Sequence, residues 1–70
     1  MTITVTVTVN GETRDLPPGV TLEDVVSQLT ESQKGVAAAL NGEVVPRRAW
    51  PATALAERDA VEIVTAVQGG

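Results

Sequence analysis

The sequence predicts one two-layer α+β domain, in which a single main helix packs on one face of a mixed sheet of four to five strands. Three observations lead to this fold class. The chain has 70 residues, which suits one domain and is too short for two. Two strand pairs are each closed by an Asn-Gly dipeptide, and the segment between them repeats its apolar residues at helical spacing.

The chain opens with a β-hairpin over residues 2–16. From Thr2 to Val9, threonine alternates with isoleucine or valine, and this period of two is typical of a half-buried strand. Asn10-Gly11 tolerates the positive φ angles of a type I′ turn, after which residues 12–16 return as a polar strand. Pro17-Pro18 ends the hairpin, because two successive residues lack the N–H that a ladder needs.

A helix of about three turns is expected to follow. Thr21 suits the N-cap, Asp24 completes a capping box, and Val20 can pack on Val25 as a hydrophobic staple. The apolar stripe of the helix comprises Leu22, Val25, Val26 and Leu29. We expect this stripe to pack on the aliphatic strand residues Ile3, Val5, Val7, Val36, Ala38, Leu40, Val61 and Ile63.

A second strand pair follows the helix. Residues 36–40 form one strand, Asn41-Gly42 closes a turn, and residues 43–45 return. The proline-rich segment 46–51 predicts one helical turn or an irregular crossover, with Trp50 filling the core.

The last strand is expected over residues 60–67, after a crossover anchored by Leu55 and a polar turn at Glu57-Arg58-Asp59. The first and last strands are the most apolar, which favours the two central, parallel positions of the sheet. The domain then covers residues 1–67, and residues 68–70 are expected to form a flexible tail.

The composition excludes most catalytic chemistry. The chain has neither cysteine nor histidine, so disulfides, thiolate chemistry, zinc or haem ligation and Ser/His or Cys/His nucleophile pairs are excluded. The Asp and Glu residues are scattered singly, and the glycines fit no phosphate-binding loop, so neither a metal site nor an active site is predicted. The chain is therefore expected not to be an enzyme.

Charge and hydropathy limit the classes of partner and the cellular location that are expected. A formal net charge of −4 repels phosphate backbones, and Trp50 is the one aromatic residue, so nucleic acid is not an expected partner. No secretory signal and no apolar run of about 18 residues are visible. The expectation is a cytoplasmic protein without membrane contact.

The most informative feature is the ending Gln68-Gly69-Gly70. Glycine has no Cβ, so such a tail can be threaded into a narrow active site of another protein. There a terminal carboxylate can be converted first to an acyl adenylate and then to an acyl-sulfur species. The tail would make the protein a carrier of a chemical group, comparable to the swinging arm of lipoamide.

Several short motifs together identify a family resemblance. They are Asn10-Gly11, Gly19-Val20-Thr21-Leu22, Ala39-Leu40-Asn41-Gly42, Val45-Pro46-Arg47 with Trp50, Val61-Glu62-Ile63-Val64 and Gly69-Gly70. With them the chain resembles, over essentially its full length, the ThiS family of ubiquitin-like β-grasp proteins, the sulfur carriers of thiazole formation in thiamine biosynthesis. Val45-Pro46-Arg47 with Trp50 is the most specific of these signals, because it separates this family from the molybdopterin-type carrier. The Glu57-Arg58-Asp59 turn departs from the family, where a Gly-Asp pair is common.

The resemblance implies a reaction cycle centred on Gly70. A ThiF-like adenylating enzyme would attach AMP to the Gly70 carboxyl, a persulfide-bearing donor would leave a thiocarboxylate, and a ThiG-like thiazole synthase would consume the sulfur. Gly69 and Gln68 would thread through the partner's channel. ATP and its metal would belong to the partner, so no cofactor is expected on the carrier itself.

Strand alternation also predicts a docking surface. It sends Ala37, Ala39, Val64 and Ala66 to the sheet face away from the helix, where apolar residues next to a reactive tail suit a partner. Arg47 is a further candidate, since it can pair with an acidic residue of that partner.

Three alternatives stay open at this point. The chain can be a sulfur carrier for molybdopterin or another thiolation pathway. It can be a ubiquitin-like modifier whose Gly70 forms isopeptide bonds with lysines. It can also be an interaction module in which the diglycine is incidental.

Overall fold

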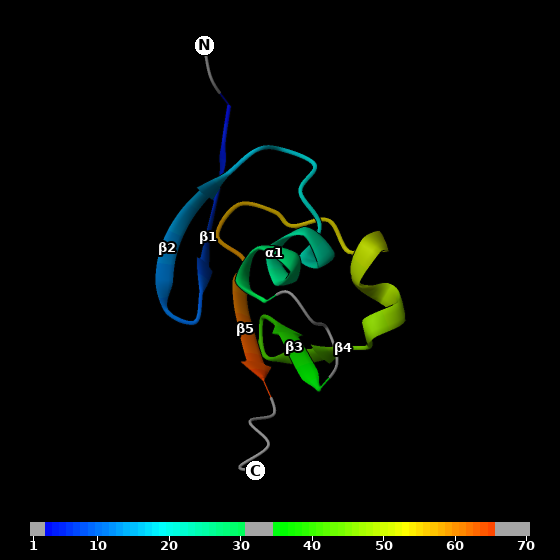
Figure 1. Ribbon diagram of the computed structural model, residues 1–70. Coiled ribbons are helices and arrows are strands. Elements are labelled where there is room, and N and C mark those ends of the chain that lie inside the picture. The colour runs from blue at the N-terminus through cyan, green and yellow to red at the C-terminus, as the bar shows by residue number, and fades with distance from the viewer. Residues whose placement is uncertain (1–2, 31–34, 66–70) are drawn as a thin grey trace.

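The computed structural model describes residues 3–30 and 35–65, which form one mixed sheet with helices on one side (Figure 1). The elements in chain order are β1 (Val5–Val9), β2 (Glu12–Leu16), α1 (Leu22–Leu29), β3 (Val36–Leu40), β4 (Glu43–Val45), the 3-10 helix η1 (Arg47–Ala52) and β5 (Ala60–Thr65). The strand order is β2-β1-β5-β3-β4. β1 and β5 run parallel at the centre, and the other neighbours are antiparallel. The predicted mixed sheet with one main helix is thereby confirmed.

Both Asn-Gly dipeptides close hairpins, as predicted. Asn10 and Gly11 have φ angles of 51° and 82°, and Asn41 and Gly42 have φ angles of 52° and 86°. Two successive positive φ angles characterise the type I′ turn, whose twist matches that of the flanking strands. The register follows from these turns, with Val9 opposite Glu12 and Leu40 opposite Glu43.

β1 begins at Val5, whereas the sequence predicted a strand from Thr2. Of the described residues, Ile3 and Thr4 lie outside the strand. The pairing between β1 and β2 ends with Val5 opposite Leu16. Pro17 and Pro18 come next and cannot donate to a ladder, so Ile3 has no partner on β2 and is 70% exposed. The expectation that Ile3 packs under the helix was wrong for this reason.

The start of α1 has the predicted cap. The Asp24 N–H donates to Thr21 Oγ1 at 3.2 Å, and the Thr21 N–H donates to Asp24 Oδ2 at 2.9 Å, which completes the capping box. Val20 and Val25 are both buried, as the predicted staple requires. These contacts satisfy backbone donors that the first helical turn would otherwise leave unpaired.

Leu29 corrects the predicted core. It is 41% exposed, whereas Leu22, Val25 and Val26 of the same stripe are buried. Leu29 follows Leu22 by seven residues and therefore faces nearly the same side of the helix. Its exposure results from its position, because α1 has 8 residues and not the three turns expected, and Leu29 is the last of them.

The core lies between the sheet and the layer formed by α1 and η1. Trp50 is 1% exposed, and its Nε1–H donates to the Val45 carbonyl oxygen at 2.9 Å, so the expectation of a core tryptophan is confirmed. Leu55 is also buried, and its N–H donates to the Val20 carbonyl oxygen at 3.0 Å. The crossover is thereby joined to the start of α1. Among residues 3–30 and 35–65, the buried hydrophobic residues are Val7, Val9, Leu16, Val20, Leu22, Val25, Val26, Ala38, Trp50, Leu55, Val61 and Ile63.

Arg58 adopts a left-handed backbone, with φ at 70°, in the polar turn that precedes β5. Such a φ costs a residue with a Cβ about 1–2 kcal/mol, whereas glycine adopts it freely but loses about 0.5–1 kcal/mol of additional entropy on folding. We expect Arg58→Gly to raise the free energy of unfolding in urea by about 0.5–1 kcal/mol. The hydrogen bond from the residue 58 N–H to the Thr6 carbonyl oxygen is a backbone contact and is retained.

Arg48→Gly is the matched control for this prediction. Arg48 lies within η1 and does not have a positive φ, so glycine there relieves no backbone strain. Glycine also destabilises a helical backbone. This control is expected to lower the free energy of unfolding. Equal losses in both variants would show that Arg58 carries no relievable strain.

This topology is that of a ubiquitin-like β-grasp fold, with the first and last strands parallel at the centre of the sheet and one main helix across it. The parallel pair positions the C-terminal strand in the middle of the molecule. β5 is paired with β1 as far as Val61 and with β3 as far as Thr65.

Candidate functional site

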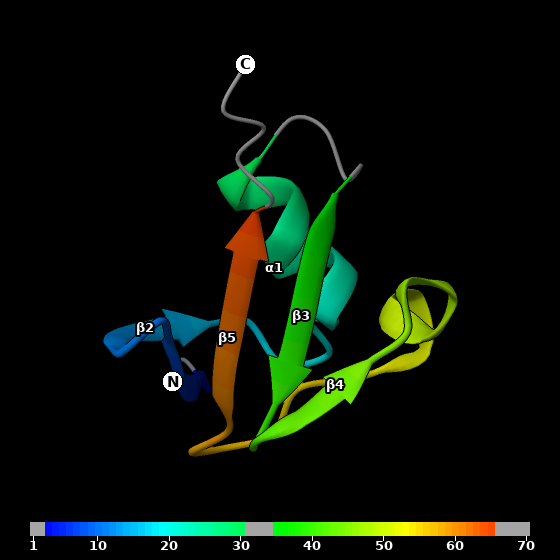
Figure 2. The same ribbon diagram turned by 90° about the horizontal axis from the view of Figure 1, so that it is seen from below.

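Figure 2 looks onto the sheet with α1 behind β5 and β3. The strand pairing divides the face away from α1 into a polar half and a mainly aliphatic half. On β1 and β2 this face carries threonines and an acid, and Thr6 Oγ1 donates to Asp15 Oδ1 at 2.8 Å. On β5, Val61 and Ile63 are buried under the helix, so alternation places Val64 on the outer face. The half over β5, β3 and β4 is aliphatic except for Glu62, which is exposed on the same face of β5, opposite Ala39.

We define the outer patch as Ala37, Ala39, Val44 and Val64. Ala37 lies directly opposite Val64 in the pairing of β3 with β5, and Ala39 lies opposite Val44 in the pairing of β3 with β4. Val64 is 64% exposed and Val44 is 77% exposed. The small alanine side chains and the exposed valine side chains together form an aliphatic surface, which apolar side chains of a partner protein can cover.

The outer patch lies next to the point where the chain leaves β5. Thr65 is the last residue of β5 and lies opposite Val36, one pair beyond Ala37 and Val64. The predicted site residues Ala66, Gln68, Gly69 and Gly70 lie outside the described residues, as does the expected end of the strand at Val67. A partner that contacts the outer patch therefore also meets the exit of the tail.

Arg47 lies apart from the other predicted contact residues. It is the first residue of η1, it is exposed, and it follows β4 by one proline. η1 packs beside α1 on the helical side of the sheet (Figure 1). The structure thus groups Ala37, Ala39 and Val64 and places Arg47 beyond the β4 edge.

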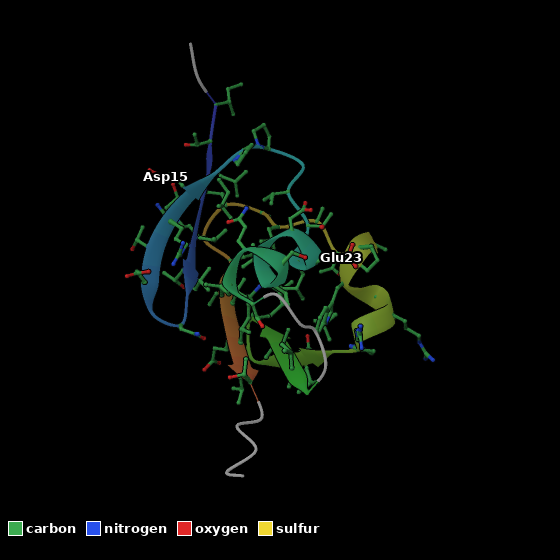
Figure 3. The ribbon with its side chains drawn as sticks, viewed as in Figure 1. Asp15 and Glu23 are labelled. Carbon is green, nitrogen blue, oxygen red and sulfur yellow. The ribbon has the colours of Figure 1, made fainter. Side chains whose placement is uncertain are left out.

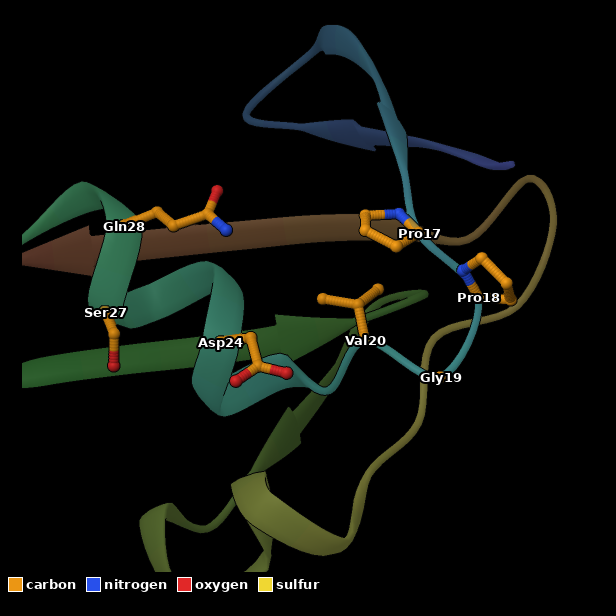
Figure 4. A pocket seen from close by; sticks show the side chains of 7 residues that line it. All are labelled: Pro17, Pro18, Gly19, Val20, Asp24, Ser27 and Gln28. Carbon is orange, nitrogen blue, oxygen red and sulfur yellow. The ribbon is translucent and has the colours of Figure 1, made fainter. Parts of the chain in front are cut away.

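An open groove lies between the loop that follows β2 and one side of α1 (Figure 4). Pro17, Pro18, Gly19 and Val20 line the loop side, and Asp24, Ser27 and Gln28 line the helix side. Asp24 already accepts the Thr21 N–H in the capping box. The groove therefore presents a capping carboxylate and neutral polar groups, which suit no particular reaction.

The described carboxylates do not gather into a reactive cluster. In Figure 3, Asp15 lies on β2 at the left of the view, and Glu23 lies on the first turn of α1 near the centre, well apart from it. Within residues 3–30 and 35–65, no group of three carboxylate, thiol or imidazole side chains is arranged to hold a metal ion. No helix in the described part of the chain has the length and apolar character needed to cross a membrane.

Comparison with known proteins identifies the family. A model described as the ThiS family matches residues 7–70. The chain belongs to the ThiS family. One similar solved structure is the thiamine biosynthesis protein (ThiS) from Geobacter metallireducens, which is 33% identical, with a TM-score of 0.75 and coverage of 94% of this chain and 100% of that chain. A comparison with curated protein sequences gave no match.

Family membership confirms the resemblance inferred from the motifs. The structure adds one residue, Val44, to the outer patch. Val44 is more exposed than Val64 yet was not among the predicted contact residues. The sequence did contain a signal for it: Val44 and Val45 are adjacent in the short strand after Asn41-Gly42, and alternation must place one of the two side chains on the outer face. Val45 faces the core side, so Val44 completes the outer patch.

Proposed function

We propose that this ThiS-family chain is a sulfur carrier for thiazole formation in thiamine biosynthesis, with the Gly70 carboxyl as the attachment site. The observation that carries the proposal is that the family match extends across the folded domain and through Gly69-Gly70. The chain acts in this cycle as a cosubstrate of partner enzymes and not as an enzyme.

The proposed chemistry requires activation, because an ionised carboxylate is a poor electrophile. A carboxylate oxygen of Gly70 attacks the α-phosphorus of ATP, and pyrophosphate leaves. Hydrosulfide can then attack the carbonyl carbon, so that AMP leaves and the thiocarboxylate forms directly. With a persulfide donor, AMP leaves and an acyl disulfide forms, and a dithiol reductant must then cleave its S–S bond to release the thiocarboxylate and the donor thiol. A ThiF-like enzyme would supply the ATP site, and a ThiG-like thiazole synthase would take the sulfur.

The geometry of the domain supports this division of labour. Gly70 lies five residues beyond Thr65, and an extended chain of five residues spans at most about 18 Å. The sheet can therefore stay on the partner's surface while the carboxyl reaches an internal active site. Because ATP and the partner enzymes must be present together, we place the reaction in the cytoplasm.

Intact-mass measurement of the purified carrier tests the proposal. After incubation with the cognate adenylating enzyme, ATP and a sulfide source, the expected mass gain equals the replacement of one oxygen by sulfur. Fragmentation should place the sulfur on Gly70, and thiazole synthase should return the carrier to its original mass. Adducts with lysine-containing proteins would instead support a modifier, and consumption of the sulfur only by a molybdopterin synthase would support the other carrier pathway.

The outer patch is the proposed docking surface for the adenylating enzyme, with Ala66 and Arg47 as further contacts. Val64→Asp places a charge in the apolar contact and is expected to weaken binding at least about tenfold, since burial of an unpaired charge is unfavourable. Titration calorimetry or the KM for the carrier measures this change.

Thr13→Asp is the matched control, because Thr13 is exposed on the outer face of β2, in the polar half. It adds the same charge to the same face of the sheet and should leave binding within about twofold. If Val64→Asp bound as well as Thr13→Asp, the outer patch would not be the docking surface.

A further inference from the structure

The hydrogen-bond ladder between β1 and β5 has a regular step. The Thr8 N–H donates to the Asp59 carbonyl oxygen at 3.0 Å, and the Asn10 N–H donates to the Val61 carbonyl oxygen at 2.8 Å. In a parallel pair the next bond would run from the amide two residues later to the Ile63 carbonyl oxygen. That residue is Glu12, which lies on β2 opposite Val9 because the chain turns at Asn10-Gly11.

The side chain of Asn10 replaces the missing strand at this point. Asn10 Nδ2 donates to the Ile63 carbonyl oxygen at 3.2 Å, and Asn10 Oδ1 accepts from the Ile63 N–H at 2.8 Å. Both bonds are partly buried. The carboxamide thus forms with Ile63 the two hydrogen bonds that two successive peptide groups of a longer β1 would form, at a position where the backbone of β1 has already turned away.

These two bonds secure the part of β5 nearest the tail. Ile63 lies two residues beyond Val61, where the paired residues of β1 and β5 end, and two residues before the end of β5 at Thr65. On its other side β5 is paired with β3 as far as Thr65. Asn10 therefore extends two-sided support of β5 beyond the last backbone pair with β1.

We propose that Asn10 is a positioning residue for the carrier reaction, because its carboxamide fixes the end of β5 and so the direction in which the chain leaves toward Gly70. This inference rests on the proposed function. A loose strand end would have to be ordered when the partner binds, and the lost conformational entropy would weaken binding. Once the carboxyl is in the partner's active site, the chemical step would proceed as before.

The protein contains a matched control at the other hairpin. Asn41 also precedes a glycine and has a φ of 52°. Its Oδ1 accepts from the Ala60 N–H at 2.9 Å, and its Nδ2 donates to Asp59 Oδ1 at 3.0 Å, so it contacts the opposite end of β5. Glycine at either position keeps the positive φ and removes only the carboxamide.

The test compares Asn10→Gly with Asn41→Gly under conditions in which both variants are folded. In the free protein, the exchange rate of the Ile63 amide, divided by that of the Leu22 and Leu55 amides, should rise about tenfold in Asn10→Gly only. In activation by the adenylating enzyme, Asn10→Gly should raise the KM for the carrier about fivefold with kcat within about twofold, and Asn41→Gly should leave both within about twofold.

Asn10→Asp tests the donor alone, since it keeps an acceptor for the Ile63 N–H but places an oxygen against the Ile63 carbonyl. It should raise the Ile63 exchange ratio and the KM as Asn10→Gly does. The proposal is overturned if the exchange ratio is unchanged in Asn10→Gly, or if both glycine variants raise KM equally. A wild-type carrier that is not activated would refute the proposed function, while the exchange ratio would still decide whether Asn10 secures the strand.

Discussion

Deletion of Gly70 is expected to abolish adenylation and sulfur transfer. The new terminal carboxyl would belong to Gly69, and it would fall short of the partner's ATP by about 3.5 Å, the length of one residue. A displacement of that size removes the attacking oxygen from reach of the α-phosphorus. Pyrophosphate release, measured with saturating carrier and enzyme, should fall to the level seen without carrier.

Stability provides the control for this variant. In the part of the chain that the structure describes, the buried core residues run in sequence from Val7 to Ile63, and we expect deletion of Gly70 to leave the free energy of unfolding unchanged. Gly69→Val should also block activation, because its β-branched side chain cannot pass a channel shaped for glycine. An added residue after Gly70 should inactivate the chain as well. Full activity in the Gly70 deletion would rule out the terminal carboxyl as the attachment site.

Leu22→Ala is expected to remove about 3–5 kcal/mol from the free energy of unfolding, a large share of the stability of so small a domain. Leu22 is 0% exposed and begins the apolar stripe of α1, and its truncation leaves a cavity between the helix and the sheet. Leu29→Ala should lower the free energy of unfolding by only about 1 kcal/mol, because that side chain is already 41% exposed.

Urea denaturation of the two variants, followed by the fluorescence of the buried Trp50, measures the difference. Both substitutions remove the same atoms from the same helix, so differences in side-chain chemistry cancel. A Leu22→Ala chain that is unfolded without denaturant would agree with the expectation. Equal losses at the two positions would mean that Leu29 belongs to the core after all.

Local patterns in the sequence determined most of the elements. The two Asn-Gly turns and the apolar pattern of residues 36–40 predicted β2, β3 and β4 with the bounds that the structure has, and the Thr21 cap predicted the start of α1. These features depend on residues close in the chain, such as Asn41-Gly42, whose allowed backbone angles already specify a hairpin turn. The motifs around Val45-Pro46-Arg47 likewise pointed to the family without any tertiary information.

The part of the candidate site that was predicted also follows from a local pattern in the sequence. Alternation alone placed Ala37, Ala39 and Val64 on one face, and the pairing of β3 with β5 confirms that they are neighbours. Val44 was missed, because periodicity over a strand of three residues is too short to single it out. The position of Arg47 beyond the β4 edge depends on the path of η1, which no local pattern specifies.

Tertiary structure decided where the elements end and which residues they contact across the molecule. β1 begins at Val5 because its partner β2 ends at Leu16, and Leu29 is exposed because the helix ends there. The contact between Asn10 and Ile63 joins residues 53 positions apart, and it exists only because the fold makes β1 and β5 parallel neighbours. The sequence by itself determined the strands, the cap, the turns and the family, since these depend on residues that are close in the chain. The support that Asn10 gives to β5 depends on residues that are distant in the chain, and only the tertiary structure decided it.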